Sequence, residues 1–387
     1  MNVPAVPDQI VSDYQSPILA KPGAVDADSA SPDAGVPFHY GDPLGEQRAT
    51  GSGSVIIDRS HRDVLTIGGA ERLTWLEGFV SQHVSELGDG AGAETLILDA
   101  NGRVEHHAVL SDVDGTLVVD TERGRGTPLL EFLTKMVFWA DAAPAQSDLA
   151  VLTLTGTALP AALTAPDGTE VTLPTGDYAS IALPGGGIAR RMPWPMAGSV
   201  DLVIPRSGLA AWFDAAVTAG ARPAGSWAYE ALRAGDTSPL RGRFGVDTDE
   251  KTIPHEVPTW IGEVAQQGAV HLEKGCYRGQ ETVARVKNLG RPPRRIVFLH
   301  LDGSGHVLPD PGTELVPLEG GRAVGTLTSV ARHAEEGPVG LGVVRYASDP
   351  EAVLLAGDVS AAQTAIVVPE KPARRERPSA PRPPVGR

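Results

Sequence analysis

The most informative segment of the sequence runs from Lys274 to Glu281 and reads K-G-C-Y-R-G-Q-E. It contains Cys276, the only cysteine among the 387 residues. Lys274 and Arg278 lie on either side of this thiol in the sequence, and neighbouring cations stabilise a thiolate and lower its pKa. The pattern therefore makes Cys276 a candidate nucleophile or metal ligand. The alternative interpretation is that a lone cysteine packs as a small buried hydrophobic side chain.

The second half of the octapeptide begins a predicted helix. Gln280 and Glu281 open it, T-V-A-R-V-K continues it, and it ends by Gly290. An acidic side chain such as Glu281 suits the positive end of a helix dipole, and a thiol at that end is activated further. Two neighbours also have simpler interpretations. Tyr277 is then a core side chain whose hydroxyl finds a partner nearby, and Arg285 is a cap or ion-pair partner on the helix.

Patterns typical of strands and helices occur on both sides of the octapeptide. Apolar runs predict strands over 54–58, 63–67, 94–99, 104–110, 116–120 and 149–154, and helical spacing predicts helices over 71–87, 128–137, 208–219 and 226–235. Asn101-Gly102 is a type I′ turn dipeptide that joins two of these strands as a hairpin. Trp75 and Trp139 sit in apolar patterns and are predicted to lie in the core. The mixture of hairpins and helices predicts an α+β fold.

A second unit follows the sequence Arg-Pro-Pro at 291–293. Its predicted strands cover 294–301, 323–330 and 339–346, with turns rich in Gly and Pro between them. This arrangement predicts a small antiparallel barrel or sandwich. The predicted domains are therefore a body over 46–290 and a C-terminal β-barrel over 291–369.

Both ends of the chain differ in composition from the middle. Residues 1–45 contain seven prolines, six aspartates and one lysine, without a sustained apolar period, and residues 371–387 contain six basic residues and one acidic residue. We predict disordered tails over 1–45 and 370–387. Contact with an anionic partner is the alternative interpretation of the basic C-terminal tail.

Charge and composition exclude several classes of function. The net charge is −15, and an acidic body argues against a broad nucleic-acid or anionic-membrane surface, since both require clustered Lys and Arg. A single cysteine excludes an internal disulfide framework and an all-cysteine metal site within one chain. No apolar run is long enough for a transmembrane helix, and the N-terminus lacks the features of a signal peptide. These observations predict a cytoplasmic protein.

Common catalytic and cofactor motifs are absent from the sequence. There is no P-loop, no dinucleotide-binding glycine fingerprint opening a helix after a strand, and no H-E-x-x-H zinc signature. His106 and His107 are adjacent, and on a strand their side chains point to opposite faces, which makes them a poor metal pair. No metal site is predicted.

The octapeptide, followed by V-A-R, resembles the signature of the YgfZ-type folate-binding proteins, which are relatives of the glycine-cleavage T-protein (aminomethyltransferase). Further segments resemble the same family: D-R-S at 58–60 followed by L-T-I-G-G-A-E-R-L-T-W-L-E-G, I-P-H-E at 253–256, V-G-T-L-T-S at 324–329 and L-G-V-V-R at 341–345. The resemblance covers about Gly51 to Val368. The octapeptide is highly specific, whereas the other segments are weak on their own.

The resemblance implies a three-subdomain ring around a central folate cavity. The body over 46–290 would be its folate-binding part, made of two interleaved α+β subdomains. Tetrahydrofolate is the implied cofactor, and iron–sulfur enzymes are the implied clients, helped in cluster synthesis or repair, with no nucleic-acid or membrane partner. Cys276 would be the key reactive group, with Lys274 beside it and with a transient iron–sulfur cluster as cargo. The implied cofactor-binding motif positions are Tyr277, Gln280, Glu281 and Arg285.

Two departures from the family pattern bear on activity. His106 and His107 stand where the aminomethyltransferases have a carboxylate pair, which argues against glycine-cleavage activity. Arg233 stands where many relatives have a Glu that hydrogen-bonds the pterin, and arginine has donors only. Glu230, about one turn away, is the predicted substitute. We therefore expect an accessory factor more than an aminomethyltransferase, with enzymatic activity left open.

Two alternatives remain. The first is a folate-dependent aminomethyl or methyl transferase, or a demethylase. The second is a cysteine acyl-transfer enzyme that pairs Cys276 with His255 or His271.

Overall fold

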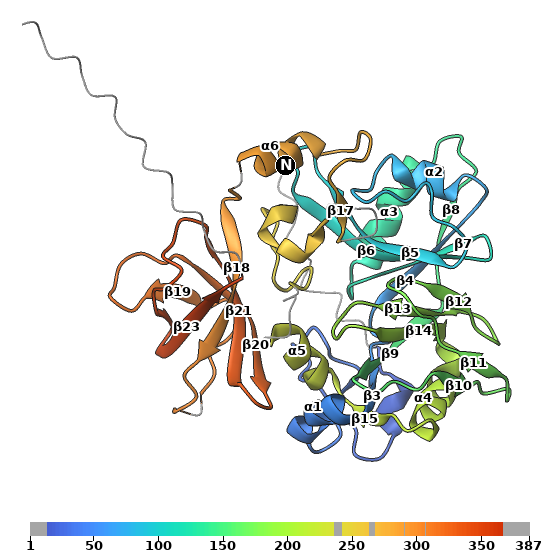
Figure 1. The fold of residues 1–387 in the computed structure, drawn as a ribbon, viewed down its shortest axis with the longest axis horizontal. Helices are drawn as coiled ribbons and strands as arrows, with labels where there is room; N and C mark the ends of the chain where they lie inside the picture. The colour runs from blue at the N-terminus through green and yellow to red at the C-terminus, as the bar shows by residue number, and fades with distance from the viewer. Residues whose placement is uncertain (1–13, 236–241, 263–267, 290, 306, 367–387) are drawn as a thin grey trace, which may run out of the picture.

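The structure is a computed structural model that describes residues 14–235, 242–262, 268–289, 291–305 and 307–366. Figure 1 shows three bodies: a barrel on one side and two sheets with their helices on the other. The helix α5 (Ser226–Ala234) lies between the barrel and the sheets. The α+β fold with a C-terminal antiparallel barrel, which the sequence predicts, is confirmed. Residues 1–13 and the predicted C-terminal tail lie outside the described residues.

The first sheet has five strands in the order β5-β6-β7-β4-β8. Their bounds are β4 (Asp63–Gly68), β5 (Ala91–Leu98), β6 (Val104–Val113), β7 (Thr116–Thr121) and β8 (Ala143–Gln146). Helices α2 (Arg72–Glu77) and α3 (Gly126–Met136) pack on this sheet. Leu129 and Leu133 of α3 are four residues apart, so they share one helix face, and both are buried in this core.

Helix α2 is much shorter than the helix that the apolar spacing predicts over 71–87. It ends at Glu77, and the Glu77 carboxylate then accepts the backbone N–H groups of Val84 and Ser85 at 2.7 and 3.1 Å. The segment that follows α2 is irregular, yet its Val84 side chain is buried in the core of the first sheet. Val80 of the same segment forms an isolated β-bridge with Ile97. The apolar pattern therefore marks burial correctly, whereas the extent of the helix is wrong.

The second sheet has six strands in the order β12-β13-β14-β9-β3-β15. Their bounds are β3 (Ser54–Asp58), β9 (Leu149–Gly156), β12 (Ser180–Ala182), β13 (Ile188–Met192), β14 (Ser199–Pro205) and β15 (Arg222–Ala224). Strand β3 is buried along its whole length, pairs antiparallel with β9, and pairs parallel with β15. The chain enters this sheet at β3, leaves it to build the first sheet, and returns at β9.

The described part of the N-terminal segment is ordered, which corrects the prediction of a disordered tail over 1–45. It forms η1 (Pro17–Ala20), β1 (Val25–Asp26), β2 (Pro37–His39) and the start of α1 (Pro43–Ser52). Ile18 is fully buried in the core of the second sheet, and the Ser16 hydroxyl donates to the Asp58 carboxylate. These anchors are single side chains in an irregular backbone, so they produce no apolar period in the sequence.

The C-terminal body is a closed barrel with the strand order β18-β21-β20-β19-β22-β23. The bounds are β18 (Arg294–Leu301), β19 (Glu314–Pro317), β20 (Gly325–His333), β21 (Gly337–Arg345), β22 (Leu354–Ala356) and β23 (Val359–Ala365). Val297 and Leu299 of β18 belong to the barrel core, whereas Ile296 and Phe298 pack with α5 outside it. This alternation follows from the two-residue period of a strand, and it fixes α5 against the barrel.

The remaining elements pack on these bodies or connect them. They are β10 (Ala162–Thr164), β11 (Glu170–Thr172), β16 (Ile261–Gly262), β17 (Val270–His271), α4 (Leu209–Thr218), α6 (Gln280–Leu289), η2 (Arg206–Gly208), η3 (Pro254–Glu256) and η4 (Pro258–Trp260). The octapeptide follows β17, and its last two residues begin α6 at the top of the view in Figure 1.

Trp139 is a second correction. It follows α3, and 98% of its surface is exposed, whereas Trp75 is partly buried and packs on the core of the first sheet. The neighbouring Phe138 is also largely exposed. An apolar sequence pattern does not distinguish a helix face from the turn that follows the helix.

Candidate functional site

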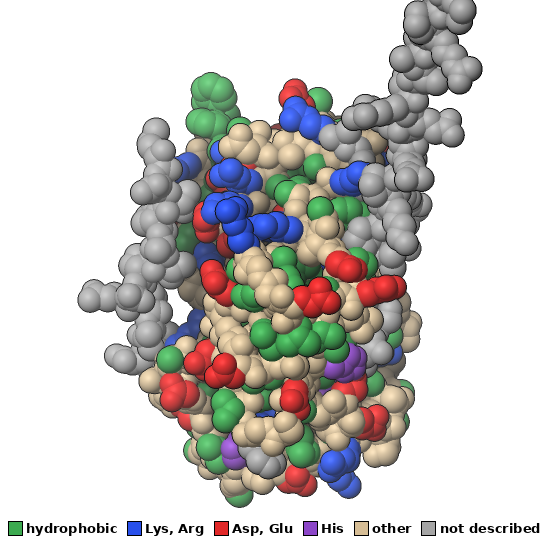
Figure 2. Space-filling model, turned by 90° about the vertical axis from the view of Figure 1, so that its left-hand side faces the viewer, with side chains coloured by type: hydrophobic (Ala, Val, Ile, Leu, Met, Phe, Trp, Pro, Cys, Tyr) green, Lys and Arg blue, Asp and Glu red, His purple; other side chains and the backbone are tan. Residues whose placement is uncertain are grey.

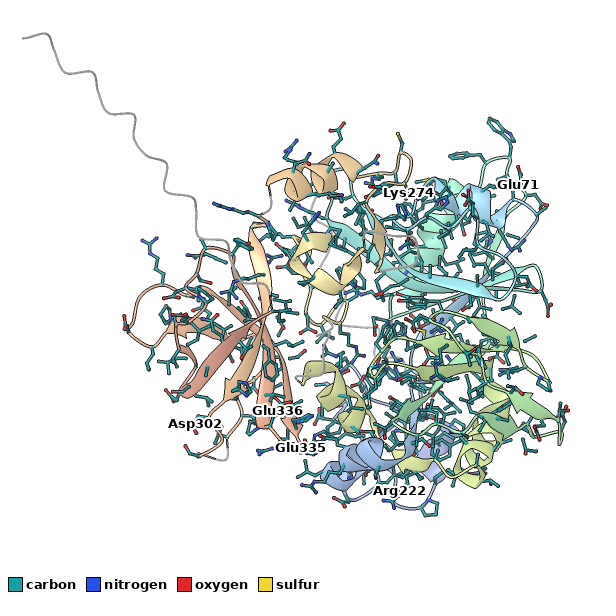
Figure 3. The ribbon with its side chains drawn as sticks, viewed as in Figure 1. Glu71, Arg222, Lys274, Asp302, Glu335 and Glu336 are labelled. Carbon is teal, nitrogen blue, oxygen red and sulfur yellow. The ribbon has the colours of Figure 1, made fainter. Side chains whose placement is uncertain are left out.

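The octapeptide forms a loop that presents Cys276 at the surface. Beneath it, the Lys274 ammonium group is buried and donates to the carbonyl oxygens of Glu77, Val80 and Gln82 at 2.9, 2.7 and 3.0 Å. Figure 3 shows Lys274 close to the segment that carries α2. Burial lowers the pKa of Lys274, and the Glu77 carboxylate, 3.0 Å away, opposes this shift. Lys274 therefore anchors the loop to the first sheet.

Two neighbours of the thiol stiffen the loop from inside. The Gln280 side chain donates to the carbonyl oxygen of Lys274 at 3.1 Å, which closes the loop at the start of α6. Tyr277 is buried in a core cluster, with its ring 5.4 Å from the Lys274 nitrogen. Burial raises the pKa of Tyr277 to about 12. These contacts agree with the simpler interpretation of Tyr277 as a core side chain.

Arg278 ties the other side of the loop to the hairpin of the first sheet. Its guanidinium group lies 2.9 Å from the Glu105 carboxylate at the start of β6. Burial raises the pKa of Glu105, and Arg278 opposes the shift. Sequence reasoning did not find this pair, because the two residues are 173 positions apart and their contact depends on how the octapeptide packs on the hairpin.

The other predicted motif residues lie on α6. Glu281 and Arg285 are exposed, as is Lys287 on the same helix. Figure 2 shows Lys and Arg side chains gathered in the upper part of the face that it presents, with Asp and Glu side chains spread below them. The structure thus brings Lys274, Tyr277 and Gln280 together around the base of the Cys276 loop and leaves Glu281 and Arg285 open to solvent.

A second polar site lies at the centre of the molecule, where α5 meets the two sheets. A cavity of about 30 Å³ is lined by Arg59, His107, Glu122, Trp194, Pro195, Tyr229, Arg233, Gly242, Arg243 and Phe244. This volume holds about two water molecules. Arg59 follows β3 and stacks over the Tyr229 ring, with its guanidinium carbon 4.1 Å from the ring centre.

Buried arginines and carboxylates surround this cavity. Arg243 lies 2.9 Å from Asp33, 3.1 Å from Glu122 and 3.1 Å from Glu230. Arg62 lies 2.6 Å from Glu122. Burial alone would raise the pKa of Glu122, but the nearby guanidinium groups hold it well below its usual range. The carboxylate therefore stays ionised although it is largely buried.

Arg233 and Glu230 belong to the same network. Arg233 donates to Glu230 at 2.6 Å, to Asp247 at 2.6 Å and to the Ser329 hydroxyl at 2.9 Å. These bonds link α5 to the barrel strand β20. Both Glu230 oxygens lie in ion pairs, one with Arg233 and the other with Arg243. Glu230, the predicted pterin ligand, is thus held by two arginines that line the central cavity, without lining it itself, and it lies apart from the Cys276 loop.

The adjacent histidines of β6 point to different surroundings. The His106 ring lies 5.7 Å from the ring of Phe132 in the core of the first sheet. Burial, with a smaller effect of Arg125, lowers the pKa of His106 to about 4. The His107 ring turns to the central cavity, and its Nε2 atom lies 2.7 Å from the Glu94 carboxylate.

The histidines considered for a thiol–imidazole pair have other surroundings. Both ring nitrogens of His255 are buried, without a hydrogen-bond partner among the described residues, and burial lowers its pKa to about 4. His271 Nδ1 accepts the backbone N–H of Glu273 at 3.2 Å. In the described part of the chain, no three His, Cys, Asp or Glu side chains are grouped in a way that could hold a metal ion.

Comparison with known proteins gives the fold a name. No family model matches the chain. The crystal structure of the glycine cleavage system aminomethyltransferase T from Bartonella henselae matches with a TM-score of 0.72 at 19% sequence identity, over 89% of this chain and 94% of that one. The chain has the T-protein fold. A putative transferase from Arabidopsis thaliana, At1g60990, described as chloroplastic, is 24% identical over 346 residues, which cover 85% of this chain and 74% of the relative.

The T-protein fold accounts for the positions of both sites. In this arrangement α5 and the segment 242–260 lie between the barrel and the two sheets (Figure 1), which brings Arg233 and Arg243 to the cavity. The octapeptide loop lies apart from that cavity, because none of its residues is among the lining side chains. No helix within the described ranges is both long and apolar enough to cross a membrane.

Proposed function

We propose that this protein is a tetrahydrofolate-binding accessory factor for the synthesis or repair of iron–sulfur clusters in client enzymes, and that it acts through Cys276. The observation that carries the proposal is the exposed Cys276 thiol on a loop that Lys274 anchors from below. An exposed thiol on a fixed loop can reach a second protein, and thiolates are the usual ligands of iron–sulfur clusters. The cluster is cargo in this proposal.

A single thiolate holds only part of a cluster. Iron–sulfur clusters are commonly bound by four cysteine ligands, and this chain has one. The other ligands must therefore come from folate, from a second copy of the chain or from the client. A transfer role suits this incomplete set, because weak ligation by one partner favours release to another.

The central cavity supports the folate part of the proposal through the chemistry of its donors. Arg59 offers N–H groups, Trp194 and Tyr229 offer aromatic faces, and the buried His107 Nδ1 atom accepts no hydrogen bond from the described residues. These groups suit a planar heterocycle with donors and acceptors along its edge. A cavity of about 30 Å³ is smaller than a pterin, so lining side chains have to shift when the ligand enters.

The thiol part is tested in cells that lack their native copy of the protein. We expect wild-type protein to restore the activity of iron–sulfur enzymes and Cys276→Ser to fail. Glu273→Ala, an exposed change in the same loop, is the matched control and should restore activity. Normal client activity with Cys276→Ser would refute the role of the thiol.

The folate part is tested by anaerobic calorimetric titration of tetrahydrofolate into purified protein. We expect saturable binding in the micromolar range. Cys276→Ser should bind equally well, because Cys276 does not line the cavity. Absence of binding by well-folded wild-type protein in several buffers would refute the folate part of the proposal. The part that concerns the Cys276 thiol would remain.

The alternative is a folate-dependent aminomethyl or methyl transferase, or a demethylase. Its support is the description of the Arabidopsis relative as a putative transferase. It predicts that an N-methyl or aminomethyl donor is consumed while methylene-tetrahydrofolate forms, which the accessory role does not. Turnover of such a donor by the purified protein would favour this alternative.

A further inference from the structure

The pair His107–Glu94 has the arrangement of a proton acceptor, an imidazole hydrogen-bonded to a buried carboxylate. His107 lies on β6 opposite Leu96 of β5, and Glu94 is its diagonal neighbour on the same strand pair. The His107 Nε2 atom lies 2.7 Å from Glu94 Oε1. Only 5% of His107 is exposed, and Glu94 is fully buried. A buried carboxylate behind an imidazole orients the ring and stabilises it when it becomes charged.

The hydrogen bonds of Glu94 determine which ring nitrogen carries the proton. The Tyr178 hydroxyl donates to Glu94 Oε2 at 3.3 Å, so the carboxylate accepts on both oxygens. An ionised carboxylate has no hydrogen to donate. When Glu94 is ionised, the His107 Nε2 atom carries the hydrogen in the bond to Glu94, and Nδ1 keeps its lone pair.

No donor among the described residues bonds to that lone pair. His107 Nδ1 is buried and has no hydrogen-bond partner among the described residues. A buried polar atom without a partner costs roughly 1–3 kcal/mol, so its retention at a cavity points to a ligand that satisfies it. The ring itself is held in place, because it stacks on Trp260 at 5.9 Å and contacts Phe244 at 6.2 Å between ring centres.

The other lining groups define the kind of ligand. The charged groups at the same cavity are Arg59, Glu122, Arg233 and Arg243. Glu122 and Arg243 form an ion pair with each other, Arg243 also pairs with Asp33, and Arg233 pairs with Asp247. Arg59 Nη1 donates to the Thr153 hydroxyl at 3.3 Å and lies 3.9 Å from the Asp201 carboxylate, and the Nη2 and Nε groups carry three more of its five N–H groups. Arg59 therefore offers donors, and His107 offers an acceptor.

We propose that His107, backed by Glu94, is the proton acceptor of the central cavity and acts on a ligand that carries an ionisable N–H or O–H group beside a carbonyl or similar acceptor. The acceptor of the ligand takes the Arg59 donors. The proton passes from the ligand to His107 Nδ1, and the bonding electron pair stays on the ligand atom. Glu94 then faces an imidazolium. This inference rests on the proposed function only in taking tetrahydrofolate as its probe.

The first test needs no ligand. Nitrogen NMR of the full-length protein with labelled histidine reports the tautomer of His107, whose signals are assigned by their loss in His107→Asn. We expect the hydrogen on Nε2 and none on Nδ1, with Nδ1 taking up a proton as the pH falls. In Glu94→Gln that uptake should need a lower pH, because the stabilising carboxylate is gone. Tyr178→Phe, which removes only one donor to Glu94, is a milder variant if Glu94→Gln does not fold.

Two results of this first test would overturn the inference. One is a hydrogen on Nδ1 in the free protein at neutral pH. The other is a His107 that stays neutral down to the pH at which the protein unfolds, since it could then accept no proton. His106→Gln serves as the matched control, because the neighbouring ring lies in the core of the first sheet and its loss should leave the His107 signals in place.

The second test separates this inference from the folate proposal. Anaerobic titration with tetrahydrofolate should shift the His107 Nδ1 signal, and His107→Asn should bind about tenfold more weakly, the value of one lost hydrogen bond. Binding with an unmoved signal and an unchanged affinity in His107→Asn would refute the acceptor and leave the folate proposal standing. Failure of tetrahydrofolate to bind, together with the expected tautomer and proton uptake, would refute folate and retain the acceptor.

Discussion

Gly102 and Gly279 lie backbone to backbone, so that a methyl group added to Gly279 would lie 2.9 Å from the Gly102 Cα atom. Gly102 belongs to the turn between β5 and β6, and Gly279 precedes α6. A methyl group on Gly102 would in turn lie 2.6 Å from the Thr282 side chain. The Cys276 loop is therefore seated on the hairpin of the first sheet through two residues without side chains.

Gly279→Ala should lower the free energy of unfolding by about 2 kcal/mol or more. Gly279 has a φ of +84°, and the added methyl group would also lie 2.6 Å from the carbonyl oxygen of Asp99. The measurement is denaturant unfolding. Gly275→Ala is the matched control in the same loop, because nothing lies within 4 Å of its added methyl group. Equal stability of Gly279→Ala and the wild type would contradict the close contact.

Lys274→Met should destabilise the protein by about 2–4 kcal/mol, because three buried carbonyl oxygens lose their shared donor. The methionine fills a similar volume, so the loss reports the hydrogen bonds more than the packing. Lys287→Met, an exposed change on α6, controls for the loss of a positive charge. Chemical unfolding at constant pH measures both variants. A Lys274→Met variant no less stable than Lys287→Met would mean that Lys274 does not anchor the loop.

His106 should make the protein less stable in acid. Its folded-state pKa is lowered to about 4, whereas an unfolded histidine titrates near 6.5. The unfolded chain therefore binds the extra proton between these values, and stability is lost as the pH falls from about 6.5 to about 4. The full shift corresponds to about 3 kcal/mol at most.

His106→Gln removes this titration and should flatten the difference in stability between pH 7 and pH 5. Unfolding curves of wild type and variant at both pH values measure it. Other groups titrate in both proteins, so the comparison uses the difference between them. An identical loss in both proteins would show that His106 is not the group responsible.

Trp139→Ala should change the free energy of unfolding by no more than about 0.5 kcal/mol, as is usual for surface positions. Trp75→Ala should cost at least about 2 kcal/mol, because Trp75 packs against Phe79 at 5.4 Å between ring centres and donates to the carbonyl oxygen of Met136 at 3.0 Å. Thermal unfolding of both variants tests the contrast. A large loss in Trp139→Ala would mean that this ring is covered in solution.

Sequence patterns predicted the elements with a strong local period. Strands β3 and β18 have the predicted bounds, because each combines a continuous apolar run with a clear turn signal. The hairpin around Asn101-Gly102 is present, but its connection runs over 99–103 and Asn101 has no positive φ, so the turn is not the predicted type I′. The irregular segment after Glu77 and the ordered residues 14–45 were not predictable in this way, because isolated side chains and backbone-to-carboxylate bonds hold them.

The same distinction between local patterns and long-range contacts applies to the two sites. The octapeptide and its charges marked Cys276 as a candidate reactive group, but its exposure was not predictable, because a lone cysteine also packs as a buried side chain; the structure exposes it. The partners of Arg233 did not, since Asp247 and Ser329 come from a different loop and from the barrel. His107 was noted only as a poor metal ligand and as a departure from a family pattern. Its pairing with Glu94 depends on strand register, which becomes visible only when the two strands are paired.

The pairing of β3 also determines when the second sheet can form during synthesis of the chain. The residues of β3 emerge from the ribosome early, but their partners are Leu152–Gly156 and Arg222–Ala224. Until those segments are made, a nascent chain carries an apolar strand with two unpaired edges, which is a template for association with other chains. Chaperone binding near residues 54–58 would shield these edges until β15 closes the sheet.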